Sequence, residues 1–126
     1  MKTYDPVIYP TNLVIASSVD ELNKAYKNDV GGNLTKTENS AATTYKMFGR
    51  KDGFAATGIV LHHKPTIKTI AHESFHAAQD MLTYIQQDFV YDGTNESWAY
   101  LIGWIALCIE DFINKEFKED KNEKLL

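Results

Sequence analysis

Residues 65–85 read PTIKTIAHESFHAAQDMLTYI, a stretch with the pattern of one long helix. Proline is tolerated in the first turn of a helix, so Pro65 is expected at the start of a long helix. The apolar residues that follow recur at helical spacing as one stripe, which consists of Ile67, Ile70, Ala71, Phe75, Ala78, Leu82 and Ile85. This periodicity predicts a central helix that is largely buried.

The middle of this predicted helix contains His72, Glu73 and His76 in the pattern HExxH. Four residues advance a helix by a little more than one turn, so both imidazoles would lie on one face and could bind a single zinc ion. Glu73 would act there as general base and then as general acid, toward a water whose pKa the zinc lowers. The alternative is an exposed polar stripe on an amphipathic helix.

A catalytic zinc generally keeps three protein ligands, so a third donor is required besides His72 and His76. Glu96 is the candidate, because it begins the next predicted helix after a turn at residues 91–94. Two antiparallel helices joined by a short turn bring the start of the second beside the later part of the first. The alternative is that the helix dipole alone favours an acidic residue in this first turn.

The second long helix is marked by apolar residues at helical spacing from Trp98 to Ile113. Trp98, Trp104 and Cys108 are expected to pack in the core. Beyond Asn114 the chain is mostly charged, so residues 115–126 are expected to be a frayed, solvated tail.

Strand signals precede these helices. The first strand is centred on residues 13–15 and is expected to open the sheet, and residues 41–48 and 54–62 flank a polar turn as a β-hairpin. A capping-box spacing at Ser18 and Glu21 predicts a short helix over about 19–28. The sequence therefore predicts one α+β domain over residues 1–126, with a mixed sheet of about three strands, two long helices and a short N-terminal helix.

Composition narrows the function classes. The chain has 126 residues, of which 44% are hydrophobic, and a formal net charge of −4, so binding of nucleic acid is not expected. A single cysteine excludes an internal disulfide. The longest apolar run is too short to cross a bilayer, and the N-terminal residues lack the features of a signal peptide, so a cytoplasmic location without membrane contact is expected.

His72-Glu73-x-x-His76 followed by Asn95-Glu96 on the next helix resembles the thermolysin-type zinc peptidases, the gluzincins. The chain is also similar in size and order to the small members called minigluzincins. This resemblance implies a zincin-like fold, Zn²⁺ as cofactor, peptide or protein substrates, and Glu96 as the third metal ligand. It further implies that substrate binds along an edge strand near residues 59–62.

The sequence departs from the gluzincin pattern at Tyr100, where that family has an aspartate that orients the first histidine. A partner for His72 is then missing or comes from elsewhere. Tyr100 is the first candidate for the residue that stabilises the oxyanion, with Tyr91 and His63 as alternatives. His62 and His63 would point to opposite sides of a strand, so either is expected at the rim of the cleft rather than as a ligand.

A narrower resemblance covers most of the chain. Tyr9-Pro10, the stretch from Ile70 to Ala77 and the stretch from Asn95 to Ile105 resemble small uncharacterised proteins that are encoded by phages of gut Bacteroidetes. This likeness implies no activity, and it supports an alternative function as a structural or accessory protein of the virion or tail that acts by binding. The location would then be the bacterial host cytoplasm or the virion.

Overall fold

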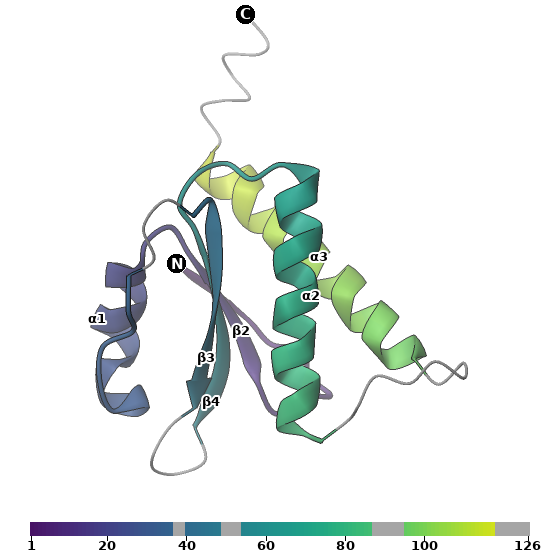
Figure 1. The fold of residues 1–126 in the computed structure, drawn as a ribbon, viewed down its shortest axis with the longest axis horizontal. Helices are drawn as coiled ribbons and strands as arrows, with labels where there is room; N and C mark the ends of the chain where they lie inside the picture. Colours follow the sequence, from purple (N-terminus) through teal and green to yellow (C-terminus); the bar gives the residue numbers. More distant parts are fainter. Residues whose placement is uncertain (37–39, 49–53, 87–94, 118–126) are drawn as a thin grey trace, which may run out of the picture.

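The computed structural model describes residues 1–36, 40–48, 54–86 and 95–117. These residues form a four-stranded mixed sheet with helices on both faces (Figure 1). In chain order the elements are β1 (Lys2–Tyr4), β2 (Asn12–Ala16), α1 (Val19–Val30), β3 (Ala42–Phe48), β4 (Ala55–Leu61), α2 (Ile67–Tyr84) and α3 (Glu96–Glu116). The predicted α+β class is confirmed.

The strand order is β1-β2-β4-β3. β2 and β4 are parallel, whereas β1 pairs antiparallel with β2 and β3 pairs antiparallel with β4. The strand predicted around residues 13–15 is confirmed as β2, but the expectation that it opens the sheet was wrong, because β1 precedes it. β1 is only three residues long, and its side chains are held by a distant partner: Tyr4 Oη and Lys2 Nζ donate to Asp111 of α3 at 2.7 and 2.8 Å.

The predicted hairpin of residues 41–48 and 54–62 is confirmed as β3 and β4, although its turn at residues 49–53 lies outside the described residues. β4 lies between β2 and β3, so it is an inner strand and not the edge. The edge strand expected near residues 59–62 is therefore corrected to β3. Sequence periodicity could not show this, because the parallel pairing of β2 with β4 joins segments far apart in the chain.

Successive side chains of β3 point to opposite faces of the sheet. Met47 and Tyr45 pack toward α1 with the smaller apolar cluster. Thr44 and Phe48 face α2, where Thr44 bonds to Glu73 and the ring of Phe48 lies 5.1 Å from that of Tyr84. One face of β3 therefore lies against α2 from Glu73 to Tyr84.

α2 begins at Ile67, after Thr66 caps it by accepting a hydrogen bond from the Thr69 N–H, and Pro65 lies just outside. The buried residues are Glu73, Ser74, Ala77, Ala78, Asp80, Met81 and Leu82. The predicted apolar stripe was therefore partly wrong, since Ile67 is 85% exposed and Phe75 is also exposed. The small side chains at this contact let α2 approach the sheet and α3 closely. The hydrophobic pattern of the sequence does not indicate the size of a side chain, so it could not predict this face.

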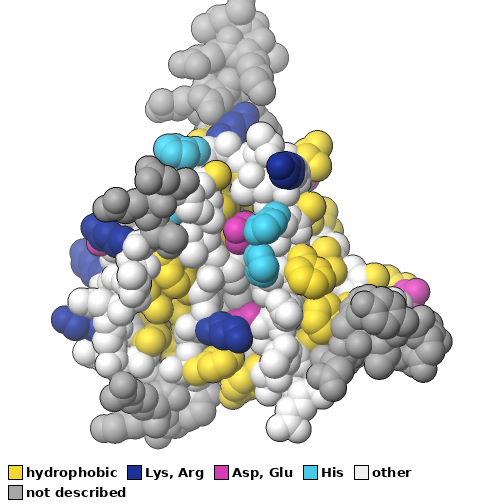
Figure 2. Space-filling view, viewed as in Figure 1, with side chains coloured by type: hydrophobic (Ala, Val, Ile, Leu, Met, Phe, Trp, Pro, Cys, Tyr) yellow, Lys and Arg dark blue, Asp and Glu magenta, His cyan; other side chains and the backbone are white. Residues whose placement is uncertain are grey.

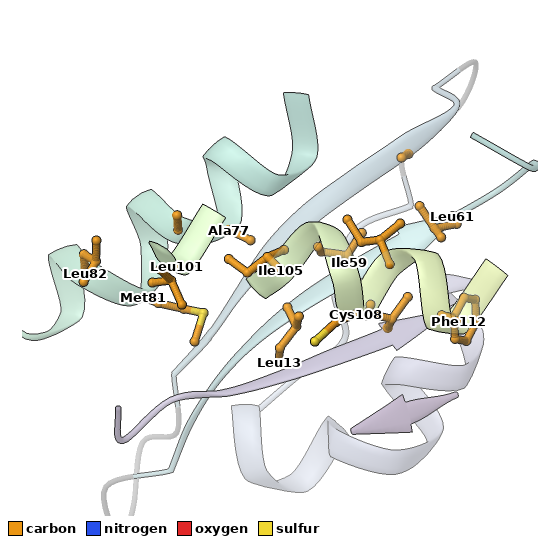
Figure 3. Close-up of a cluster of buried hydrophobic side chains, with 14 of the residues drawn as sticks. Leu13, Ile59, Leu61, Ala77, Met81, Leu82, Leu101, Ile105, Cys108 and Phe112 are labelled. Carbon is orange, nitrogen blue, oxygen red and sulfur yellow. The ribbon is translucent and has the colours of Figure 1, made fainter. Parts of the chain in front are cut away.

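α2 and α3 cover one face of the sheet and α1 covers the other (Figure 1). The larger core lies under α2 and α3, where Leu13 and Ile59 of the sheet meet Met81 of α2 and Ile105 of α3 (Figure 3). Trp98 and Cys108 are buried as predicted, and Trp104 is partly buried against this core. This arrangement places α2 between the core and the cleft described below.

α3 is regular to Glu116, so the fraying expected from residue 115 does not begin there, and the remaining tail lies outside the described residues. The turn predicted at 91–94 lies outside them as well. Among the helices that the structure describes, none combines the length and apolar character needed to span a membrane.

Candidate functional site

A cleft of about 340 Å³ lies between the edge strand β3 and α2. Most of its polar lining comes from these two elements: Thr43, Thr44 and Lys46 from β3, and His72, Glu73, His76, Gln79 and Asp80 from α2. Ser40, just before β3, completes it. Figure 2 shows histidine and acidic side chains side by side at the centre of this face of the molecule. The predicted histidines and Glu73 thus lie together in the lining of one cleft.

The two histidines converge. Nε2 of His72 lies 3.1 Å from Nε2 of His76, and both side chains are exposed to solvent. A tetrahedral zinc site with Zn–N bonds of about 2.05 Å separates two ligand nitrogens by roughly 3.3 Å. The spacing and direction of the pair therefore fit two ligands of one metal ion, because one turn of helix brings their rings together.

Glu73 is buried, with 6% of its surface exposed. Its Oε2 accepts a hydrogen bond of 2.7 Å from the hydroxyl of Thr44. A buried carboxylate needs such donors, because desolvation without them is costly. Glu73 is thus tied to the edge strand at a point where it borders the two histidines.

Glu96 is exposed at the first position of α3. Among the described residues, no three histidine, cysteine or acidic side chains are grouped closely enough to hold a metal ion, so the structure does not gather Glu96 with the histidines. The start of α3 nevertheless lies beside the motif. The ring of Trp98 lies 6.1 Å from that of Phe75, and Phe75 lies 6.1 Å from the ring of His76.

Tyr100 does not line the cleft. It is 76% exposed and borders a separate pocket of about 180 Å³, together with Pro6, Ile8, Tyr9, Leu101 and Trp104. Tyr100 is therefore dropped as the oxyanion-stabilising candidate, because its position on α3 turns it toward the loop after β1. Tyr91, an alternative, lies outside the described residues.

His62 and His63 follow the end of β4 and do not belong to the lining of the cleft. His63 is exposed and His62 is half-buried. Neither residue is therefore positioned to stabilise an oxyanion in this cleft.

Thr44, Lys46 and Asp80 are among the cleft residues that the sequence analysis did not single out. Asp80 is 3% exposed, and its Oδ2 accepts a hydrogen bond of 2.5 Å from Thr57 of β4. Burial is the largest influence on this group and raises its pKa, while the Thr57 bond and the charge of Lys46 act in the opposite direction. The signal for Asp80 was its spacing of seven residues from Glu73, which places both carboxylates on one helix face.

The chain matches no protein-family model, no curated protein and no solved structure at a significant level, so these comparisons assign neither a family nor a function.

Proposed function

We propose that this protein is a zinc-dependent peptidase whose active site is the cleft between β3 and α2. The observation that supports this most directly is the 3.1 Å approach of the two histidine Nε2 atoms beside the buried carboxylate of Glu73. Two imidazoles and one carboxylate in HExxH spacing are the donor set and the proton acceptor that zinc-dependent hydrolysis uses.

His72 and His76 would supply two metal ligands, and Glu96 is the proposed third. When bound, zinc would lower the pKa of a water and polarise the carbonyl of the scissile peptide bond. Support for Glu96 is its place at the start of α3, next to the helix that carries the histidines, and the exposure that leaves its side chain free to reorient.

Glu73 would accept a proton from the attacking water and return it to the leaving amine. Its hydrogen bond with Thr44 restricts the carboxylate to one orientation, with one oxygen committed to the edge strand. Burial reduces competition from bulk water for the same carboxylate. Both features would reduce the reorganisation needed during proton transfer.

The substrate would lie along β3, which pairs with β4 on one side and has no strand on the other among the residues described. An extended peptide added to such an edge gains main-chain hydrogen bonds that do not depend on sequence. Since β3 carries Thr44, the same strand would align the peptide with Glu73.

The direct test combines metal content with hydrolysis. Elemental analysis of the wild type should find about one zinc per chain, with less in His72→Ala and Glu96→Ala. The zinc-loaded wild type should cleave members of a diverse peptide library, whereas Glu73→Gln should bind zinc and cleave none. A zinc-loaded wild type that cleaves no peptide, like Glu73→Gln, would refute the proposal.

A second candidate function is favoured by one observation. Val7 and Ile8 are 84% and 80% exposed, and they lie in the loop that borders the apolar pocket next to Tyr100. Val7 also has a positive φ of 68°, which is rare for a β-branched residue. Exposed apolar side chains of this kind are typical of a contact surface.

This surface would serve the alternative suggested by the phage resemblance, in which the protein acts by binding in a virion or tail. Stoichiometric co-purification with assembled particles would support that function. If Ile8→Asp weakens this co-purification, the contact with the particle involves the loop after β1. Absence from purified particles would argue against it.

A further inference from the structure

The cleft has an ordered series of facing residues along its length. Thr44 of β3 meets Glu73 of α2, and four residues further along the strand Phe48 meets Tyr84 near the end of the helix. Between these two contacts lie Lys46, two residues after Thr44, and Asp80, seven residues after Glu73. β3 and α2 therefore run side by side in the same direction, and the Phe48–Tyr84 ring contact lies further along both elements than Lys46 and Asp80.

Asp80 is incompletely satisfied in this position. Thr57 donates to Oδ2, whereas the buried Oδ1 has no hydrogen-bond partner among the residues that the structure describes. Most buried polar side-chain atoms in folded proteins have a hydrogen-bond partner, and an unpaired carboxylate oxygen is costly. Asp80 lines the cleft, although Oδ1 itself has almost no exposed surface, so a donor that enters the cleft would satisfy this oxygen once the carboxylate turns toward it.

Lys46 is the nearest cation from the facing strand. Its charge acts to lower the pKa of Asp80, yet it donates no hydrogen bond to Oδ1, and its side chain is exposed. The long, flexible lysine side chain is thus close enough to interact electrostatically with Asp80, but no hydrogen bond to Oδ1 fixes its position. A cationic ligand would compete with Lys46 for the same carboxylate.

We propose that the Asp80 end of the cleft is a subsite for a cationic group of an extended peptide, an ammonium or a guanidinium. This inference rests on the peptidase function proposed above, since it names the substrates that the same cleft would prefer. Seven helical residues span about 10 Å, which an extended chain covers in roughly three residues. The cationic group would therefore lie about three residues from the bond presented to Glu73.

The shared chemistry has two sources in a peptide, a basic side chain or the free α-amino group. A basic side chain would make the subsite a determinant of internal cleavage. If the subsite binds the α-amino group, it would recognise the amino terminus of the substrate and place the cleaved bond at a fixed number of residues from it. Peptides of matched composition separate these two cases.

Binding is measured on zinc-supplemented Glu73→Gln protein, which would prevent turnover, by fluorescence anisotropy. The probes are end-capped hexapeptides of alanine and glutamine with a single lysine at each position in turn, the same peptide without lysine, and that peptide with a free amino terminus. The best cationic probe should bind about tenfold more tightly than the neutral capped peptide, as expected for a charge-assisted hydrogen bond. Asp80→Asn should abolish this preference, and Lys46→Met should increase it about threefold, the range of a weak charge pair.

The Lys46→Met arm keeps the test decisive if Asp80→Asn does not fold, because Lys46 is exposed. Equal binding of all probes, a preference that survives Asp80→Asn, or a preference unaltered by Lys46→Met would each overturn the subsite. Hydrolysis of the same peptides by the zinc-loaded wild type is scored separately. Cleavage without a preference for cationic peptides would contradict only the proposed subsite. An Asp80-dependent preference without any cleavage would support the subsite and contradict the peptidase function.

Discussion

The hydroxyl of Thr44, on the edge strand, donates a hydrogen bond of 2.7 Å to the buried carboxylate of Glu73, on the helix that carries the two histidines. These residues are far apart in the sequence, and their contact links the sheet edge to the centre of the candidate site. It makes the orientation of Glu73 dependent on the position of β3. The first prediction follows from this bond.

Replacing Thr44 by valine should lower peptide hydrolysis by about tenfold and stability by about 1–3 kcal/mol, because a buried carboxylate loses a hydrogen-bond donor at nearly constant side-chain volume. Thr44→Ser keeps the hydroxyl and serves as the matched control. Steady-state kinetics should show the loss in kcat rather than KM, and urea unfolding should report the stability. Equal behaviour of the valine and serine variants would show that the bond does not position Glu73.

Zinc should stabilise the folded protein through the two histidines. At a free zinc concentration of about one hundred times Kd, the expected gain is roughly 2.7 kcal/mol, since the metal binds the folded state preferentially. Thermal unfolding should show a rise in Tm that a chelator reverses and that is lost in the double variant His72→Ala, His76→Ala. Because histidine ligands must be deprotonated, the gain should shrink as the pH falls. A rise of the same size in the double variant would place the zinc elsewhere.

The hydrogen bonds between β1 and Asp111 of α3 should make the free energy of unfolding sensitive to acid. Hydrogen bonds from Lys2, Tyr4 and Lys115 hold the pKa of Asp111 well below its usual range. A carboxyl whose pKa is lowered on folding stabilises the protein above its unfolded pKa, and this stabilisation is lost as the pH falls toward the folded value. The difference in unfolding free energy between wild type and Asp111→Asn should therefore be largest near neutral pH and decrease below about pH 4. Urea unfolding across this range measures it, and a difference independent of pH would contradict the assignment.

Gly58 of β4 lies under the face of the sheet that α1 covers. A Cβ at this position would lie 3.1 Å from Leu22 Cδ1 and 3.2 Å from Met47 Cε. Because both neighbours are fully buried, Gly58→Ala should destabilise the protein by about 1–2 kcal/mol through overpacking. Gly32→Ala is the control, since its added Cβ meets no atom within 4 Å. Chemical denaturation of both variants gives the comparison, and a Gly58→Ala protein as stable as the control would show that Met47 repacks without cost.

Short-range features of this protein could be predicted because their geometry repeats within one element. The spacing of His72 and His76 implies that their rings meet on one turn of helix, and they do. The capping of α1 is similarly local: Ser18 accepts from the Glu21 N–H as expected, although the Glu21 side chain turns to Ser17. The helix runs to Val30 rather than about residue 28, because Gly31 adopts the left-handed conformation that ends it.

Local sequence patterns were enough to predict the α+β class, the hairpin, the two long helices and the pair of histidines on one helix face, because periodicity and loop length are properties of neighbouring residues. Three features could be known only from the fold: β3 lies at a sheet edge, Asp80 is buried in the cleft with one oxygen unpaired among the described residues, and Tyr100 faces a different pocket. These features depend on which strands pair and on which side of α2 the sheet packs. Both choices are made by contacts between segments that are distant in the chain, and no local pattern records them.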